Sequence, residues 1–134
     1  MAHPAYEVAQ HSYARCVRHP EFFAILYDAL LASDPRIPPM FENTAFPRQH
    51  KLLQHGLGLI LSYAKSPDDA LLERIAARHS REGIDVPPDM YDHFVSSLMK
   101  AVEQTDPRFD ADVRVAWLEA ATPGLDFMKS RYRP

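Results

Sequence analysis

The chain has 134 residues, of which 46% are hydrophobic and 25% charged, with a formal net charge of −3 and a single cysteine, Cys16. This composition excludes a disordered chain, and one cysteine excludes an internal disulfide or a thiolate metal cage. The weakly acidic balance argues against nucleic acid as a partner, and no apolar run approaches the roughly 20 residues that cross a membrane. Because no secretory signal is visible either, we expect one cytoplasmic domain spanning residues 1–134.

Twelve prolines punctuate a pattern that otherwise favours helices. The first helix is expected over about residues 5–17. The second begins at Pro20 and carries an apolar stripe at spacings of three and four, through Leu31. Residues 35–41 are expected to form a short, tight helical turn, and residues 42–46 a loop. Pro47 then opens a long helix that runs to about Lys65.

Ser66 or Asp68 is expected to cap the next helix, which ends at Gly83. Pro87-Pro88-Asp89 starts a further helix, which Asp106-Pro107 ends. In the last helix, over about residues 113–128, Pro123-Gly124 predicts a kink or a short interruption. No segment alternates with period two over enough residues to form a strand. The sequence therefore predicts an all-α domain of about six to seven helices.

His79 lies on the apolar face of its helix, in line with Leu72, Ile75 and Ala76. Taken alone, it reads most simply as a core histidine that hydrogen-bonds a backbone carbonyl. The functional alternative is a neutral imidazole bound to a metal. No second histidine completes a multi-histidine site, because His50 and His55 face different directions on their helix. A single-histidine metal site requires a group that supplies the other ligands, and haem does so with its four pyrrole nitrogens.

Tyr27 and Gln49 are each ambiguous alone. Tyr27 lies within an apolar stripe, where a core tyrosine with its hydroxyl at the surface is an equal alternative. Gln49, one turn before Leu53, also fits a half-buried polar residue near a helix start. The aromatic residues at helical spacing, and Trp117 in particular, fit an ordinary core.

The order of these residues resembles the globin family, and more narrowly the bacterial single-domain and flavohaemoglobin-type globins. Tyr27 is followed by Phe41 fourteen residues on, then by Gln49 with Leu53 one turn later, and by His79 thirty residues past Gln49. The segments that carry the match are FFAILYDALLASDPRIPPMF, PRQHKLLQHGL and LLERIAARHSREGI, then the helix after Pro88 and the Ala116-Trp117 pair. The resemblance covers nearly the whole chain.

The resemblance implies a globin fold around haem b, with His79 as the proximal iron ligand. It implies that Tyr27 and Gln49 hydrogen-bond the gas ligand (O2, NO or CO), with Leu53 above the ligand site. A tyrosine hydroxyl and an amide can both donate to the partial negative charge on bound O2, more strongly in a dry pocket. His50 is expected to point elsewhere, because one residue turns about 100° on a helix. The further cofactor contacts implied are Phe41, Phe46, Ile75, Tyr91, Phe94 and Leu98.

The chain departs from the flavohaemoglobin pattern in several places. Two additional residues lie between His79 and Tyr91, Tyr132 falls where a glutamate of the proximal network is expected, and no reductase domain follows. We therefore expect that any nitric oxide dioxygenase or peroxidase-like turnover needs an external reductase. Reversible gas binding is the leading hypothesis. The alternatives are a stand-alone gas sensor that signals to a partner protein, and a haem-free helical interaction module.

Overall fold

The computed structural model describes residues 4–80 and 85–132, and within these residues it is all-helical, as the sequence predicts. Its elements are α1 (Pro4–Val17), α2 (Phe22–Ser33), the 3-10 helix η1 (Pro38–Phe41), α3 (Phe46–Lys65), α4 (Asp69–His79), α5 (Met90–Thr105) and α6 (Ala111–Ser130). No helix of this part of the chain is both long and apolar enough to span a membrane.

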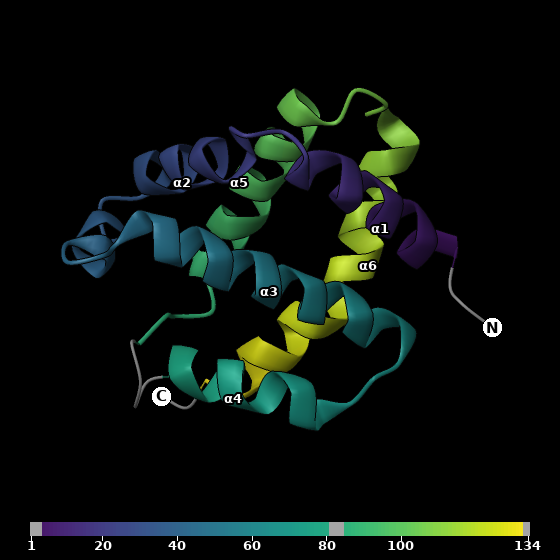
Figure 1. The fold of residues 1–134 in the computed structure, drawn as a ribbon. Coiled ribbons are helices and arrows are strands. Elements are labelled where there is room, and N and C mark those ends of the chain that lie inside the picture. Colours follow the sequence, from purple (N-terminus) through teal and green to yellow (C-terminus); the bar gives the residue numbers. More distant parts are fainter. Residues whose placement is uncertain (1–3, 81–84, 133–134) are drawn as a thin grey trace.

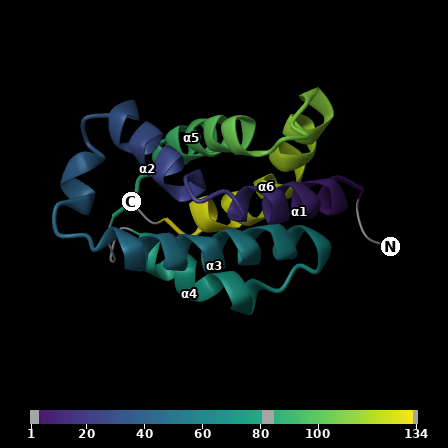
Figure 2. The same ribbon diagram turned by 45° about the horizontal axis from the view of Figure 1, so that its top comes forward.

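The long last helix, α6, is the centre of the arrangement. It packs against α1, α3 and α4, while α2 packs against α5. Figure 2 shows these contacts as layers, with α2 and α5 on one side, α1 and α6 in the middle, and α3 and α4 on the other side. Helices α5 and α6 run across the direction of α3, and η1 carries the chain from α2 to α3 at one end of the molecule (Figure 1).

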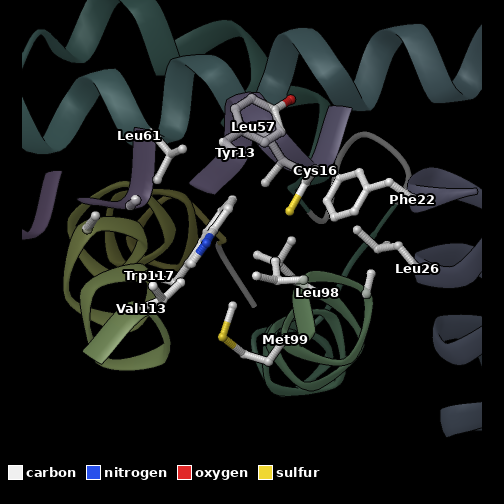
Figure 3. Packing of buried hydrophobic residues seen from close by; sticks show 14 residues of the cluster. Tyr13, Cys16, Phe22, Leu26, Leu57, Leu61, Leu98, Met99, Val113 and Trp117 are labelled. Atoms are coloured by element: carbon white, nitrogen blue, oxygen red, sulfur yellow. The ribbon is translucent and has the colours of Figure 1, made fainter. Parts of the chain in front are cut away.

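The largest hydrophobic cluster joins five of the helices, because α1, α2, α3, α5 and α6 each place an apolar face in it. Trp117 is fully buried there and Leu98 of α5 is 1% exposed. Figure 3 shows both side chains directed into the same space as Cys16 and Phe22. The indole Nε1 of Trp117 donates to Ser12 Oγ (2.8 Å), so its polar atom is satisfied inside the core. Trp117 is thus the core anchor that the sequence predicts.

Two smaller clusters lie outside this core. The Tyr27 cluster contains Tyr27, Leu30, Ile37 and Met90, with partly buried side chains such as Phe41, Phe46, Leu53 and Phe94 packed on it. The Leu72 cluster gathers the inner face of α4 against α3, α5 and α6, and includes Ile60, Leu72, Ala76, Tyr91 and Leu125, with Ile75 packed on it. Phe94 and Val86 contact both clusters.

Most helix boundaries follow local signals. The Asp68 carboxylate accepts from Ala70 N (3.1 Å) and caps α4, which makes Asp68 the N-cap. The expected start of the second helix at Pro20 is wrong by two residues, since Phe22 N donates to His19 O (3.2 Å) in a turn that precedes α2. Helix α4 ends at His79, where Ser80 becomes extended, before the expected stop at Gly83, which lies outside the described residues.

Of the kink or short interruption expected at Pro123-Gly124, the interruption is wrong, because α6 continues through both residues, and the kink stays a prediction. Pro123 faces solvent, so the carbonyl of Glu119 that loses its helical partner can be hydrated. Gly124 is buried against α3, and a Cβ there would lie 3.1 Å from Ile60 Cγ2 and 3.2 Å from Ile60 O. The close contact between α6 and α3 holds this part of the helix in place.

Candidate haem site

His79 is the last residue of α4 and is half-buried beside the Leu72 cluster. Its Nδ1 lies 2.8 Å from the carbonyl oxygen of Ile75, one turn earlier in the same helix. A carbonyl only accepts, so this contact fixes the proton on Nδ1 and leaves Nε2 with its lone pair. In many proteins, a hydrogen bond from the ring nitrogen that does not bind the metal orients the ring of a metal-binding histidine.

Burial lowers the pKa of His79 below its ordinary value, against the opposing effect of the hydrogen bond to Ile75 O, and the neighbouring charge of Arg78 lowers it further. The imidazole is therefore neutral at pH 7, which is the form that binds a metal. Within residues 4–80 and 85–132, no group of three or more histidine, cysteine or acidic side chains is placed to hold a metal ion. These residues therefore offer a metal one nitrogen ligand, the Nε2 of His79.

Tyr27 and Gln49 come together from two helices, α2 and α3. The Gln49 side-chain amide donates to the Tyr27 hydroxyl oxygen over 3.0 Å. Tyr27 is 4% exposed, and burial raises the pKa of its hydroxyl more than this hydrogen bond lowers it, so the phenol stays protonated. Among the described residues, no acceptor takes the hydroxyl hydrogen, which is therefore available to a ligand.

His50 also belongs to this group of residues, contrary to the expectation that it points elsewhere. Its ring is stacked on Tyr27 with centroids 5.4 Å apart and an interplanar angle of 13°. It also stacks on Phe23 (5.8 Å) and meets the edge of Phe46 (6.2 Å). Sequence reasoning missed His50, although the spacing of Phe46, His50, Leu53 and Leu57 places all four on one face of α3. This face of α3 is wide enough for both Gln49 and His50 to contact Tyr27.

The other predicted contacts surround these two centres. Phe41 of η1 and Phe46 each lie 5.6 Å from the Tyr27 ring, edge to face. Leu53 and Phe94 also pack on the Tyr27 cluster, whereas Ile75 packs on the Leu72 cluster. Tyr91 is 5% exposed in the Leu72 cluster, and burial raises the pKa of its hydroxyl to about 12. Leu98 lies in the main core with Trp117, so a direct cofactor contact from Leu98 stays a prediction.

Tyr132, which falls where a glutamate of the proximal network is expected, contacts Asp85. Its hydroxyl donates to the Asp85 carboxylate at 2.7 Å, which ties the end of the chain to the segment that follows α4. Within that segment, Val86 N donates to His79 O (3.0 Å) and Asp85 adopts a positive φ of 54°. Val86, which precedes the Pro87-Pro88 pair, is thus hydrogen-bonded directly to the last residue of α4.

The residues present fit a haem. His79 offers one neutral nitrogen with its tautomer fixed, and the Tyr27 hydroxyl offers one unused hydrogen-bond donor. The side chains expected to contact a porphyrin are mainly apolar and only partly buried, namely Phe41, Phe46, Leu53, Ile75 and Phe94. These partly buried apolar side chains, which are divided between the two clusters, form the kind of surface that a flat apolar ring would cover.

The geometry defines an all-α protein with one histidine whose Nε2 could bind a metal. The chain is 34% identical to a Pseudomonas aeruginosa protein whose crystal structure is described as structurally highly homologous to a human hemoglobin. The match covers 97% of this chain and 99% of that chain, with a TM-score of 0.94. The chain therefore belongs to the globin family, whose fold implies haem binding. No family model and no curated protein matches it.

Proposed function

We propose that this chain is a haem-b globin that binds oxygen reversibly, and NO and CO at the same position. The observation that carries the proposal is the His79 geometry, in which Ile75 O engages Nδ1 and leaves Nε2 for a metal. Haem would supply the iron at which the gas binds. His79 would hold it from α4, and the five partly buried apolar side chains described above would exclude water from its faces.

Tyr27, which lies in the other of the two clusters, would donate its hydroxyl hydrogen to the gas ligand. Gln49 supports this role, because a hydroxyl that accepts one hydrogen bond becomes a better donor of another. Leu53 would limit the space beside the donor. A donor in a site of low polarity slows oxygen release. This arrangement favours retention and scavenging of oxygen over rapid delivery.

Catalytic turnover, such as dioxygenation of nitric oxide, would need electrons from a separate reductase. We propose such a reductase as the redox partner, and the cytoplasm as the location of the protein. Reversible binding requires no such partner, and it is the function that the described residues support most directly. The gas-sensor alternative would need a partner protein whose binding depends on the ligand.

The haem-free alternative calls for a direct test, because the polar groups have partners in the chain itself. Gln49 bonds to Tyr27 and His79 to Ile75 O, so an unfilled site would leave no buried side-chain atom unsatisfied among the described residues. The hydrogen bonding is thus the same for a haem-free module, and absorption spectroscopy distinguishes it from a haem protein.

The experiment is the absorption spectrum of the protein, expressed with adequate haem, in its ferric, ferrous and carbonyl forms. We expect a Soret band that shifts on reduction and on binding CO, and we expect His79→Ala to abolish or strongly alter it. His55→Ala is the matched control, since His55 is an exposed histidine of α3 outside both clusters. A wild-type protein without a Soret band would refute the proposal and favour the haem-free module.

A further inference from the structure

A surface depression of about 580 Å³ lies where the end of α1 meets the connection between α5 and α6. This volume is within the range of roughly 300–1,000 Å³ that small-molecule sites occupy. None of the haem-site residues contributes to it. The residues that line it are His11, Ala14, Arg15, Arg18, His19, Thr105, Pro107 and Arg108.

The lining is basic in a chain whose formal net charge is −3. Arg15 is neutralised by the buried Asp106 carboxylate, to which its Nε and Nη2 donate at 2.6 and 2.9 Å, and Asp110 is also close to it. Arg18 and Arg108 are exposed and take part in no ion pair within the described part of the chain. Two guanidinium groups, each with five donors, are therefore available to a ligand.

His19 adds a donor, because a backbone contact determines which of its ring nitrogens carries the proton. Glu21 N donates to His19 Nδ1 (3.1 Å), so Nδ1 is the unprotonated nitrogen of the neutral ring. The proton is then on Nε2, which makes that nitrogen a donor even without a charge on the ring. The depression is thus lined by two unpaired arginines and a histidine that can donate.

From these observations we infer that the depression binds a multivalent oxyanion, with a diphosphate group as the best match. The planar guanidinium fork pairs with two phosphate oxygens at once, and two such forks favour a ligand that carries more than one charged oxygen pair. Ala14 and Pro107 add a small apolar border. The inference does not depend on haem. The simple alternative is that the arginines only offset the dipoles at the ends of α1 and α5.

The test is a calorimetric titration of the purified protein with inorganic pyrophosphate at low ionic strength, where screening is weak. We expect saturable binding of one pyrophosphate per chain. Arg18→Gln and Arg108→Gln should each weaken it about tenfold, because each removes a charge-assisted bond. Both side chains are exposed and form no ion pair with the described residues, so circular dichroism should show unchanged folding.

Arg74→Gln is the matched control, because Arg74 is an exposed arginine of α4 whose loss lowers the net charge equally. Absence of saturable binding, or equal weakening by all three substitutions, would overturn the proposal and leave the dipole role. A nucleoside diphosphate titrated in parallel distinguishes two sources of the same group. Equal affinity assigns recognition to the diphosphate alone, and tighter binding assigns a nucleotide.

Discussion

Gln49 donates its side-chain amide to the Tyr27 hydroxyl over 3.0 Å, so the two residues expected at the gas ligand are already bonded to each other. The bond occupies a lone pair of the hydroxyl oxygen and leaves its hydrogen available. Burial keeps the phenol protonated by raising the pKa of Tyr27. The Tyr27 hydroxyl is therefore a donor polarised by the hydrogen bond that it accepts from Gln49.

Tyr27→Phe is expected to raise the oxygen off-rate about tenfold or more, because a hydrogen bond of about 1.5 kcal/mol corresponds to roughly that factor. The measurement is stopped-flow displacement of oxygen by CO. Tyr63→Phe is the control, since the Tyr63 hydroxyl bonds to the exposed Asp69 at the start of α4 and not to a residue of the Tyr27 cluster. An off-rate unchanged by Tyr27→Phe would reject the donor role.

Gln49→Leu and His50→Leu should have different effects, although the two residues are neighbours. The first removes the hydrogen bond to Tyr27 and should raise the oxygen off-rate severalfold with little loss of stability. The second removes a ring in contact with Tyr27, Phe23 and Phe46 and should lower the free energy of unfolding by about 1 kcal/mol or more. Off-rates and urea unfolding measured on both variants check this. The reverse pattern would make His50 the principal polar partner of the ligand.

Asp106→Asn should lower the free energy of unfolding by about 3 kcal/mol, because it leaves the Arg15 charge without its partner. The Asp106 side chain is fully enclosed and accepts from Ser12 Oγ (2.6 Å) as well as from Arg15. Urea unfolding at pH 7 measures the loss. Asp126→Asn, an exposed carboxylate of α6, should change stability by less than about 0.5 kcal/mol.

The same carboxylate predicts an acid dependence. Desolvation raises the pKa of Asp106, but the hydrogen bonds from Arg15, Ser12 and Arg108 N together outweigh it, so the net pKa is lowered. Unfolded Asp takes up a proton near pH 3.9, and folded Asp106 only at lower pH. Its contribution to stability is therefore complete above pH 3.9 and is lost as the pH falls through the folded-state pKa. The stability of Asp106→Asn should depend less on pH in that window; equal slopes would contradict the assignment.

Gly124→Ala should destabilise the protein by about 1–2 kcal/mol, although alanine favours a helix over glycine. The new Cβ would press on Ile60 backbone atoms at 3.2–3.3 Å, which cannot move without shifting α3. Gly56→Ala on α3 is the matched control, because a Cβ there has no neighbour within 4 Å. It should stabilise by roughly 0.5–1 kcal/mol. Thermal unfolding of both variants tests the pair, and stabilisation by both would refute the close contact.

Much of the fold follows from local sequence signals. Proline positions and apolar spacing predict the all-α class and nearly all helix ranges, because the helical period and the missing proline N–H act over a few residues. The failures occur where neighbouring segments decide. Nothing near Pro123 in the chain indicates that α6 continues, because packing of Gly124 on Ile60 of α3 is a tertiary contact.

In the candidate site, too, some features follow from local sequence signals and others from contacts between helices. Apolar spacing alone predicts that His79 lies on an apolar helix face, and the order of Tyr27, Phe41, Gln49 and Leu53 before it indicates a globin. The bond from Gln49 to Tyr27 and the stacking of His50 on Tyr27 join two helices and are seen only in the folded structure, whereas the contact of His79 Nδ1 with Ile75 O lies within α4. The reason is physical: helix periodicity determines which face a residue occupies, whereas its partner on another helix depends on how the helices cross.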